Sequence, residues 1–472
     1  MKKLFIFSLA ALLTLAFGSA YAQAPVGSGI TLTASGYWDM EYLLGRNATS
    51  AIRFNYGAAP AAAFDRSFSW IKTRGRLLFN VAAGKEVNAT VYFEIDADPY
   101  GGPPGTTAQG TLQRGTAGYW SADRSAVEVK WLYFDFAVPV IPVPITVRVG
   151  QQGLGFRSIV QSNDGAGITA SMKLDPVTID AVWAKALEGD VYKPDDSDMY
   201  ALRVRTTLGK LTVGGYGMYF NFNTNPLTWT ATGGVGATQR ADFWYLGAYA
   251  DGKVGPVNIN FDFVLDKGKV SSPTPGILKS KYNGWATKLN VDYPWDKFNF
   301  GAGIMYMTGD DKNKAADKKY HGFVAVPASE GAGGTGEAII FYGAPDVLPS
   351  GGLGISGGPT STFASAGDGG SWWAKIYAKA QITPSYKVHA KLFYIGDTTK
   401  NGDTWGTLDG DHKFIGWEFD LINSIQLYKN LKFEIAGGVM GVGNALKFVD
   451  NHGDVRKPKT PWAIVGDLMY TF

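Results

Sequence analysis

The feature that most constrains this chain is a two-residue alternation of apolar and polar side chains, repeated in many separate segments. In the last segment, residues 462–472, Trp462 and Leu468 fall on one face, whereas Asp467 and Thr471 fall on the other. Successive side chains of a β-strand point to opposite sides, so this spacing is typical of a strand with one apolar face. The same alternation recurs in residues 87–96, 257–266, 297–306 and 386–395. We therefore predict an all-β chain.

Segments of this kind predict about 18 strands, with about 16 as the alternative count. We place them near residues 30–44, 67–83, 86–98, 125–138, 143–152, 165–174, 177–189, 198–208, 210–222, 241–252, 255–267, 281–292, 297–308, 371–382, 385–397, 412–427, 430–444 and 461–472. A tilted strand needs about 9–11 residues to cross a bilayer, and these segments are long enough to do so.

The connections between the segments alternate between short and long along the whole chain. Short ones include Gly84-Lys85, Asp175-Pro176 and Lys429-Asn430. The long ones fall near residues 45–66, 99–124, 153–164, 190–197, 223–240, 268–280, 309–370, 398–411 and 445–460. Outer-membrane barrels have short periplasmic turns and long extracellular loops, whereas a soluble β-propeller or sandwich has no reason to sort loop length in this way. We predict a transmembrane antiparallel up-and-down β-barrel, closed because hydrocarbon offers the backbone no hydrogen-bond partner.

The N-terminus is typical of an export signal. Two lysines precede an apolar run at residues 4–17, and Ala20-Tyr21-Ala22 then supplies the small-x-small pattern that signal peptidase reads. We expect residues 1–22 to be a cleaved Sec signal peptide and residues 23–472 to form a single barrel domain, of which 309–370 is the longest extracellular loop. The expected location is the outer membrane of a Gram-negative cell.

Composition agrees with a barrel and excludes several other classes. The chain has 61 glycines, 14% aromatic residues and 18% charged residues, compared with about 25% charged residues in an average soluble protein. Its net charge of +3 includes the two lysines of the signal segment, and no clustered basic excess suggests a nucleic-acid partner. The absence of cysteine rules out disulfides and thiolate metal sites.

Charged side chains fall on the parity opposite to the apolar face and define a candidate pore lining. A charge facing lipid near the bilayer midplane costs about 2–4 kcal/mol, so this segregation predicts water inside the barrel. The inward residues on strands are Lys72, Arg74, Arg76, Glu94, Asp96, Arg148, Asp180, Arg203, Arg205, Asp242, Asp262, Lys375, Lys379, Lys387, Lys391, Glu418 and Asp420. The connection 153–164 adds Arg157 and Asp164 and has the option of folding inward to narrow the pore.

These charges leave two roles open. Neighbouring strands carry opposite signs, so the side chains can brace the wall through cross-strand pairs worth about 0.2–1 kcal/mol each. Alternatively, they set a transverse field that favours polar solutes over apolar ones. Aromatic residues on the same predicted parity offer surfaces on which sugars could stack, unless they belong to the interfacial girdles; they are Trp70, Tyr92, Trp244, Trp373 and Tyr377.

No motif demands catalysis or a metal. Residues 354–358 match the pattern G-x-S-x-G, but they lie in a glycine-rich loop without the strand and helix that such a nucleophile elbow needs. The four histidines show no metal-ligand spacing, and the acidic residues near 195–198 and 403–411 do not fit the calcium-binding EF-hand. We expect no enzymatic activity, no cofactor and no metal.

Several stretches resemble the outer-membrane homotrimeric porins of sulfate-reducing bacteria. The likeness is carried by residues 127–136, 147–154 and 164–171 and by Arg74-Gly75-Arg76. It implies a trimer of water-filled barrels with general diffusion. More distantly, the Gly150 region and residues 416–420 resemble 18-stranded alginate-export channels, although here the inward acids nearly match the inward bases.

The function expected from these observations is that of a porin for passive diffusion of small hydrophilic solutes and ions. The alternatives are a substrate-specific channel for an oligosaccharide or an organic anion, and, from another class, a surface structural protein or an outer-membrane enzyme. Expected partners are outer-membrane lipid, lipopolysaccharide and two further copies of the chain. The terminal Phe472 resembles the signal that barrel-assembly machinery reads, and we expect it at the periplasmic rim.

Overall fold

A computed structural model gives the fold of the chain. It describes residues 29–48, 67–97, 126–139, 142–157, 159–160, 163–187, 196–222, 240–271, 280–311, 313, 319–326, 337–341, 370–401, 410–449 and 453–472. The predicted signal peptide at 1–22 and the G-x-S-x-G pattern at 354–358 lie outside the described residues. Among the described residues, no helix is long and apolar enough to cross a membrane.

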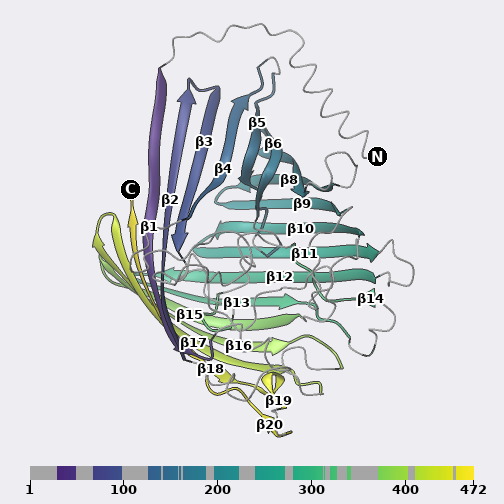
Figure 1. Ribbon diagram of the computed structural model, residues 1–472, viewed down its shortest axis with the longest axis vertical. Coiled ribbons are helices and arrows are strands. Elements are labelled where there is room, and N and C mark those ends of the chain that lie inside the picture. The colour runs from purple at the N-terminus through teal and green to yellow at the C-terminus, as the bar shows by residue number, and fades with distance from the viewer. Residues whose placement is uncertain are drawn as a thin grey trace.

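Long strands make up most of the described chain (Figure 1). Those of the wall are β1 (Ile30–Arg46), β2 (Ser67–Ala83), β3 (Val87–Ala97), β4 (Ala126–Ala137), β5 (Ile145–Gly153), β6 (Asp164–Leu174), β7 (Val177–Leu187), β8 (Ser197–Leu208), β9 (Leu211–Phe222), β10 (Arg240–Val254), β11 (Val257–Ser271), β12 (Ser280–Trp295), β13 (Phe298–Met307), β15 (Ser371–Thr383), β16 (Tyr386–Asp397), β17 (Phe414–Tyr428), β18 (Leu431–Val442) and β21 (Trp462–Thr471). The connections contain β14 (Lys319–Tyr320), β19 (Phe448–Val449), β20 (Val455–Arg456) and the short 3-10 helix η3 (Asn444–Leu446).

The wall strands form one closed antiparallel ring. The main sheet has 19 strands, one of which, β14, is a two-residue parallel addition to β12; without it, 18 strands remain. Each of these pairs with its neighbours in chain order, and β1 pairs with both β2 and β21, so no edge is left open. The predicted all-β transmembrane up-and-down barrel of 18 strands is confirmed.

Alternating exposure separates the two faces of the wall. On β8, Leu202 and Val204 are exposed, whereas Met199 and Ala201 are buried. On β10, Leu246 is 63% exposed. Apolar side chains exposed on the convex face form the surface that meets lipid, because a sheet closed into a barrel has one outside and one inside.

Short turns join the strands at one end of the barrel and long connections join them at the other. Gly209 and Gly255 begin two of the short turns with positive φ angles of 64° and 58°, a conformation that glycine adopts without steric cost. Strands β10 and β12 extend beyond the predicted ranges 241–252 and 281–292 and end at Val254 and Trp295, because the cross-strand ladder continues to the residue before the turn. Both β1 and β21 have their terminal ends at the short-turn side.

Candidate pore interior

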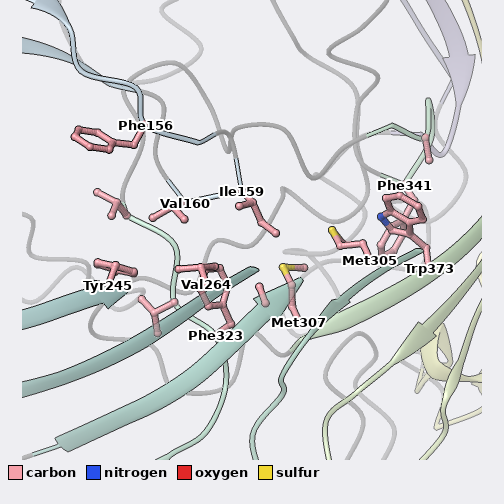
Figure 2. Close-up of a cluster of buried hydrophobic side chains, with 14 of the residues drawn as sticks. Phe156, Ile159, Val160, Tyr245, Val264, Met305, Met307, Phe323, Phe341 and Trp373 are labelled. Carbon is pink, nitrogen blue, oxygen red and sulfur yellow. The ribbon is translucent and has the colours of Figure 1, made fainter. Parts of the chain in front are cut away.

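Three segments from the long connections pack inside the barrel. Phe156, Ile159 and Val160 come from the connection after β5, and Phe323 and Phe341 come from the connection after β13. Figure 2 shows these side chains beside residues of the wall, namely Tyr245, Val264, Met305, Met307 and Trp373. The apolar inner face of the wall at this level therefore contacts apolar loop residues, and the barrel is narrowed from within.

Arg157 anchors the first segment to the wall. Its guanidinium group forms ion pairs with Asp251 on β10 and Asp262 on β11, with the closest nitrogen–oxygen distance 2.5 Å in each. The same group lies over the ring of Tyr249, 4.5 Å from its centroid. Burial alone would lower the pKa of Arg157, but the hydrogen bonds that its guanidinium donates to both carboxylates outweigh burial and raise the pKa. The sequence left inward folding of this connection open, and its described residues lie inside the barrel.

The second segment, residues 320–326, is held by backbone bonds to the barrel and to the first segment. The amide of Phe323 donates to the carbonyl of Thr308 over 2.8 Å, and the amide of Val326 donates to the carbonyl of Val160 over 2.9 Å. Asp310 accepts from the amide of Gly322 over 2.8 Å. The two inserted segments are thus joined to each other as well as to the wall.

Residues 337–341 form a further inserted piece, bound by charged side chains of the wall. Glu418 accepts from the amides of Ile340 and Phe341 over 2.5 and 3.0 Å, and Asp420 accepts from the amide of Ile339 over 3.2 Å. The backbone of residues 337–341 is not part of any strand, so its amides have no partners in a sheet. The carboxylates of Glu418 and Asp420 accept from these buried amides, which would otherwise be costly to bury without a partner.

Glu337 contacts three lysines of the wall through its side chain and its backbone carbonyl. It forms ion pairs with Lys375 and, over 2.9 Å, with Lys288, while Lys391 donates to its backbone carbonyl over 2.8 Å. The ammonium group of Lys375 also lies 4.9 Å from the ring centroid of Tyr377. We refer to Lys288, Lys375, Lys379, Lys387 and Lys391, on β12, β15 and β16, as the lysine cluster.

Most of the other charges predicted to face inward lie on the inner face and pair across neighbouring strands. Arg74 bonds Asp96 over 3.2 Å, and Arg76 bonds Glu94 over 2.5 Å. Asp180 accepts from Arg203 over 2.9 Å and from Arg205. Lys72 lies beside Glu41 in the β1–β2 register and is 3% exposed.

Two predicted residues pair with partners that the alternation did not single out. The guanidinium of Arg148 forms a bidentate ion pair with the carboxylate of Asp135, with hydrogen bonds of 2.7 and 3.0 Å. The carboxylate of Asp164 lies 2.7 Å from the ammonium group of Lys130. The ladder between β3 and β4 shifts register at Tyr92 and Phe93. This irregularity moves Lys130 off the parity on which strict alternation would place it, which is why sequence reasoning missed it.

Lys379 and Lys387 differ from the rest of the lysine cluster because they are exposed, near the short turn between β15 and β16. Neither forms an ion pair with a carboxylate among the described residues. Lys379 lies 5.3 Å from the ring centroid of Tyr377. These two ammonium groups are available to solutes that enter from the short-turn end.

The assignment of Asp242 and Trp244 to the interior was wrong. On β10 the buried positions are Phe243 and Tyr245, and Trp244 is 59% exposed on the outer face. Asp242 shares that outer face, where it accepts from Tyr219 over 2.7 Å. The inner face of β10 is aromatic because it packs against the inserted segments. Assigning the polar side chains of this strand to the interior therefore gave the wrong orientation.

Carboxylates on β1, β18 and β21 come together on the inner face, an arrangement that the alternation did not predict although it placed Asp467 on the polar face. Glu41 is directly paired with Asp467, and Asp467 is directly paired with Glu434, so three buried carboxylates lie in a row across three strands. We call this row the carboxylate line. Strand parity places each of these residues on the polar face, but only the register of the ladders shows that they are directly paired. Glu337, by contrast, lies in a loop without periodicity, and no sequence signal points to it.

No protein-family model and no curated protein sequence matches this chain. Many solved structures share its fold at low identity, three of which are compared below. OccK8 (OprE) of Pseudomonas aeruginosa has a TM-score of 0.50 and 11% identity, with 93% of this chain and 98% of that one covered. OccAB4 of Acinetobacter baumannii has a TM-score of 0.51 and 9% identity over 95% and 100% of the two chains. A BenF-like porin from Pseudomonas fluorescens has a TM-score of 0.51 and 10% identity over 93% and 98%. At such identities the similarity is one of fold.

Proposed function

We propose that this protein is an outer-membrane porin through which small hydrophilic solutes and ions diffuse passively. The observation that carries the proposal is a charged inner face, narrowed by anchored loop segments, within a closed barrel whose outer face is apolar. So many ionised groups on one face require a wet interior, because their burial in hydrocarbon would be prohibitive. One solved structure with the same fold is a BenF-like porin, which agrees with a channel.

The distribution of sign around the interior supports a transverse field. The carboxylate line occupies β18, β21 and β1, and the lysine cluster occupies β12, β15 and β16. Like charges at directly paired positions destabilise a sheet. The carboxylate line therefore does not act as a brace between its own members, and we infer that it contributes to the field felt by permeating solutes.

A channel selective for organic anions is the second candidate. It is favoured by the lysine cluster, in which Lys375 lies 5.3 Å from the ring centroid of Trp373 and 4.9 Å from that of Tyr377. Ammonium groups beside aromatic rings suit a carboxylate attached to a planar or apolar body.

The remaining proposals extend the resemblance seen in the sequence. We propose membership of the homotrimeric porins of sulfate-reducing bacteria, export through the signal at residues 1–22, and recognition of Phe472 by barrel-assembly machinery. The backbone of Phe472 exchanges two hydrogen bonds with Gly36, at 2.9 and 3.1 Å, so the terminal residue takes part in closing the ring. Its place at the short-turn end suits recognition from the periplasm.

Ion selectivity of single channels tests the proposed role of the lysine cluster. We expect Lys379→Gln with Lys387→Gln to lower the chloride-to-potassium permeability ratio by roughly 5-fold, since a unit charge acting through water at about 4 Å contributes about 1 kcal/mol. The matched control is Lys267→Gln with Lys281→Gln, which removes the same charge from the outer face. An equal change in both variants would contradict a pore-lining role for the cluster.

A further inference from the structure

The long-loop rim of β9–β12 carries a cavity that the proposed channel does not use. Its volume is about 620 Å³, and its lining includes Lys267, Lys269, Lys281, Lys319 and Trp244. On β10, β11 and β12 these residues have the parity of the exposed outer face, opposite to the buried residues of the interior. The cavity therefore offers these side chains to the surroundings of the barrel rather than to its lumen.

The four lysines of this cavity form a dense group, which we call the lysine rim. Lys269 is directly paired with Lys281 in the β11–β12 ladder, and Lys281 is directly paired with Lys319 in the short β12–β14 ladder. Neighbouring strands lie about 4.8 Å apart, so three ammonium groups are gathered side by side. Like charges in directly opposed positions destabilise a sheet unless something neutralises them.

Few carboxylates neutralise the lysine rim. Asp242 lies 3.3 Å from Lys269, and it also accepts a hydrogen bond from Tyr219. Among the residues that the structure describes, Lys267, Lys281 and Lys319 form no ion pair. The excess positive charge points to an anionic ligand that brings more than one negative group.

The level of the lysine rim relative to the membrane identifies the kind of ligand. Directly below it on the outer face, Leu246 is paired with Leu265, and Leu265 is paired with Trp285; all three are exposed. Trp244 lies between these levels and stacks on Tyr219 with ring centroids 4.3 Å apart, as residues of an interfacial girdle do. At about 3.3 Å per residue, Lys269 stands roughly 13 Å along the strand from Leu265, at headgroup height.

We propose that the lysine rim binds the phosphate groups of lipopolysaccharide in the outer leaflet, with the acyl chains against the apolar belt below. Lysine ammonium groups are strong point-charge partners of phosphate. The inference rests on the proposed outer-membrane location, because lipopolysaccharide is the lipid of that leaflet. It assigns this glycolipid one defined site on the barrel, over β10–β12 and β14.

Binding in detergent tests the site without requiring a conducting channel. Purified barrels are mixed with lipopolysaccharide, and bound glycolipid is counted by native mass spectrometry. We expect Lys267→Gln, Lys269→Gln and Lys281→Gln together to weaken binding by roughly 100-fold. The matched control, Lys210→Gln, Lys253→Gln and Lys297→Gln, removes the same charge from exposed positions at the short-turn end and should bind like wild type.

Two further binding experiments test whether the site needs the phosphate groups of lipopolysaccharide and whether free phosphate can replace the glycolipid. Lipopolysaccharide stripped of its phosphates should bind as weakly as the rim variant, and inorganic phosphate at equal concentration should not compete. Equal binding by wild type and the rim variant, or full competition by inorganic phosphate, would overturn the proposal. A barrel that binds lipopolysaccharide but carries no current would contradict the porin function alone, and the reverse result would contradict this site alone.

Discussion

At the scale of single residues, Arg157 anchors the first inserted segment to the wall of the barrel. It is the charged contact of the first inserted segment, and both of its partners, Asp251 and Asp262, belong to the wall. Asp262 is buried, so removal of the guanidinium would leave a carboxylate without its counter-ion. Truncating one member of a buried pair costs about 3–5 kcal/mol, far more than the pair's net contribution.

We therefore expect Arg157→Ala to reduce the free energy of unfolding by about 3 kcal/mol and to raise single-channel conductance. Urea unfolding of the barrel in lipid vesicles and planar-bilayer recording measure the two effects. The matched control is Arg148→Ala, because the side chain of Arg148 is 38% exposed where it pairs with Asp135, and this variant should cost about 1 kcal/mol or less. Equal destabilisation by both variants would show that Arg157 has no special anchoring role.

At the scale of elements, the strands follow from the sequence and the inserted segments do not. Alternation fixes which side chains of β2, β8 or β17 face inward, because a one-residue slip would turn every side chain to the wrong face. The inserted segments have no such period. Their contacts, such as those of Glu337 with Lys288 and Lys375, join residues far apart in the chain. Asp242 shows the remaining weakness, since alternation identifies two faces but not which one packs against a loop.

Residues 337–341 provide a test at this scale. Glu418→Ala removes the acceptor of the Ile340 and Phe341 amides, and hydrogen bonds to a charged acceptor contribute about 1.5–3 kcal/mol each. Hydrogen exchange at residues 338–341 should accelerate by more than about 10-fold. The control Glu434→Ala removes a buried carboxylate of the adjacent strand, which bonds Ser424 instead. Acceleration by both variants alike would mean that the segment is not held by Glu418.

At the scale of the whole molecule, the backbone, the outer face and the inner face of the barrel have different roles. The closed ring satisfies the backbone, the outer face meets lipid, and the inner face carries the charges. The inserted segments narrow the interior, while Lys379 and Lys387 remain exposed near the short turn between β15 and β16. We propose that such a barrel admits water and small polar solutes, and that charged side chains of the inner face set its selectivity.

Single-channel recording of the purified protein in planar bilayers tests this account most directly. A porin predicts discrete, ohmic conductance steps that scale with salt concentration and are enlarged by Arg157→Ala. Correct insertion is checked independently, by the β-sheet circular dichroism of the reconstituted protein and its protection from protease. Inserted, folded barrels that remain electrically silent in both wild type and Arg157→Ala would contradict the proposal that this protein is a channel.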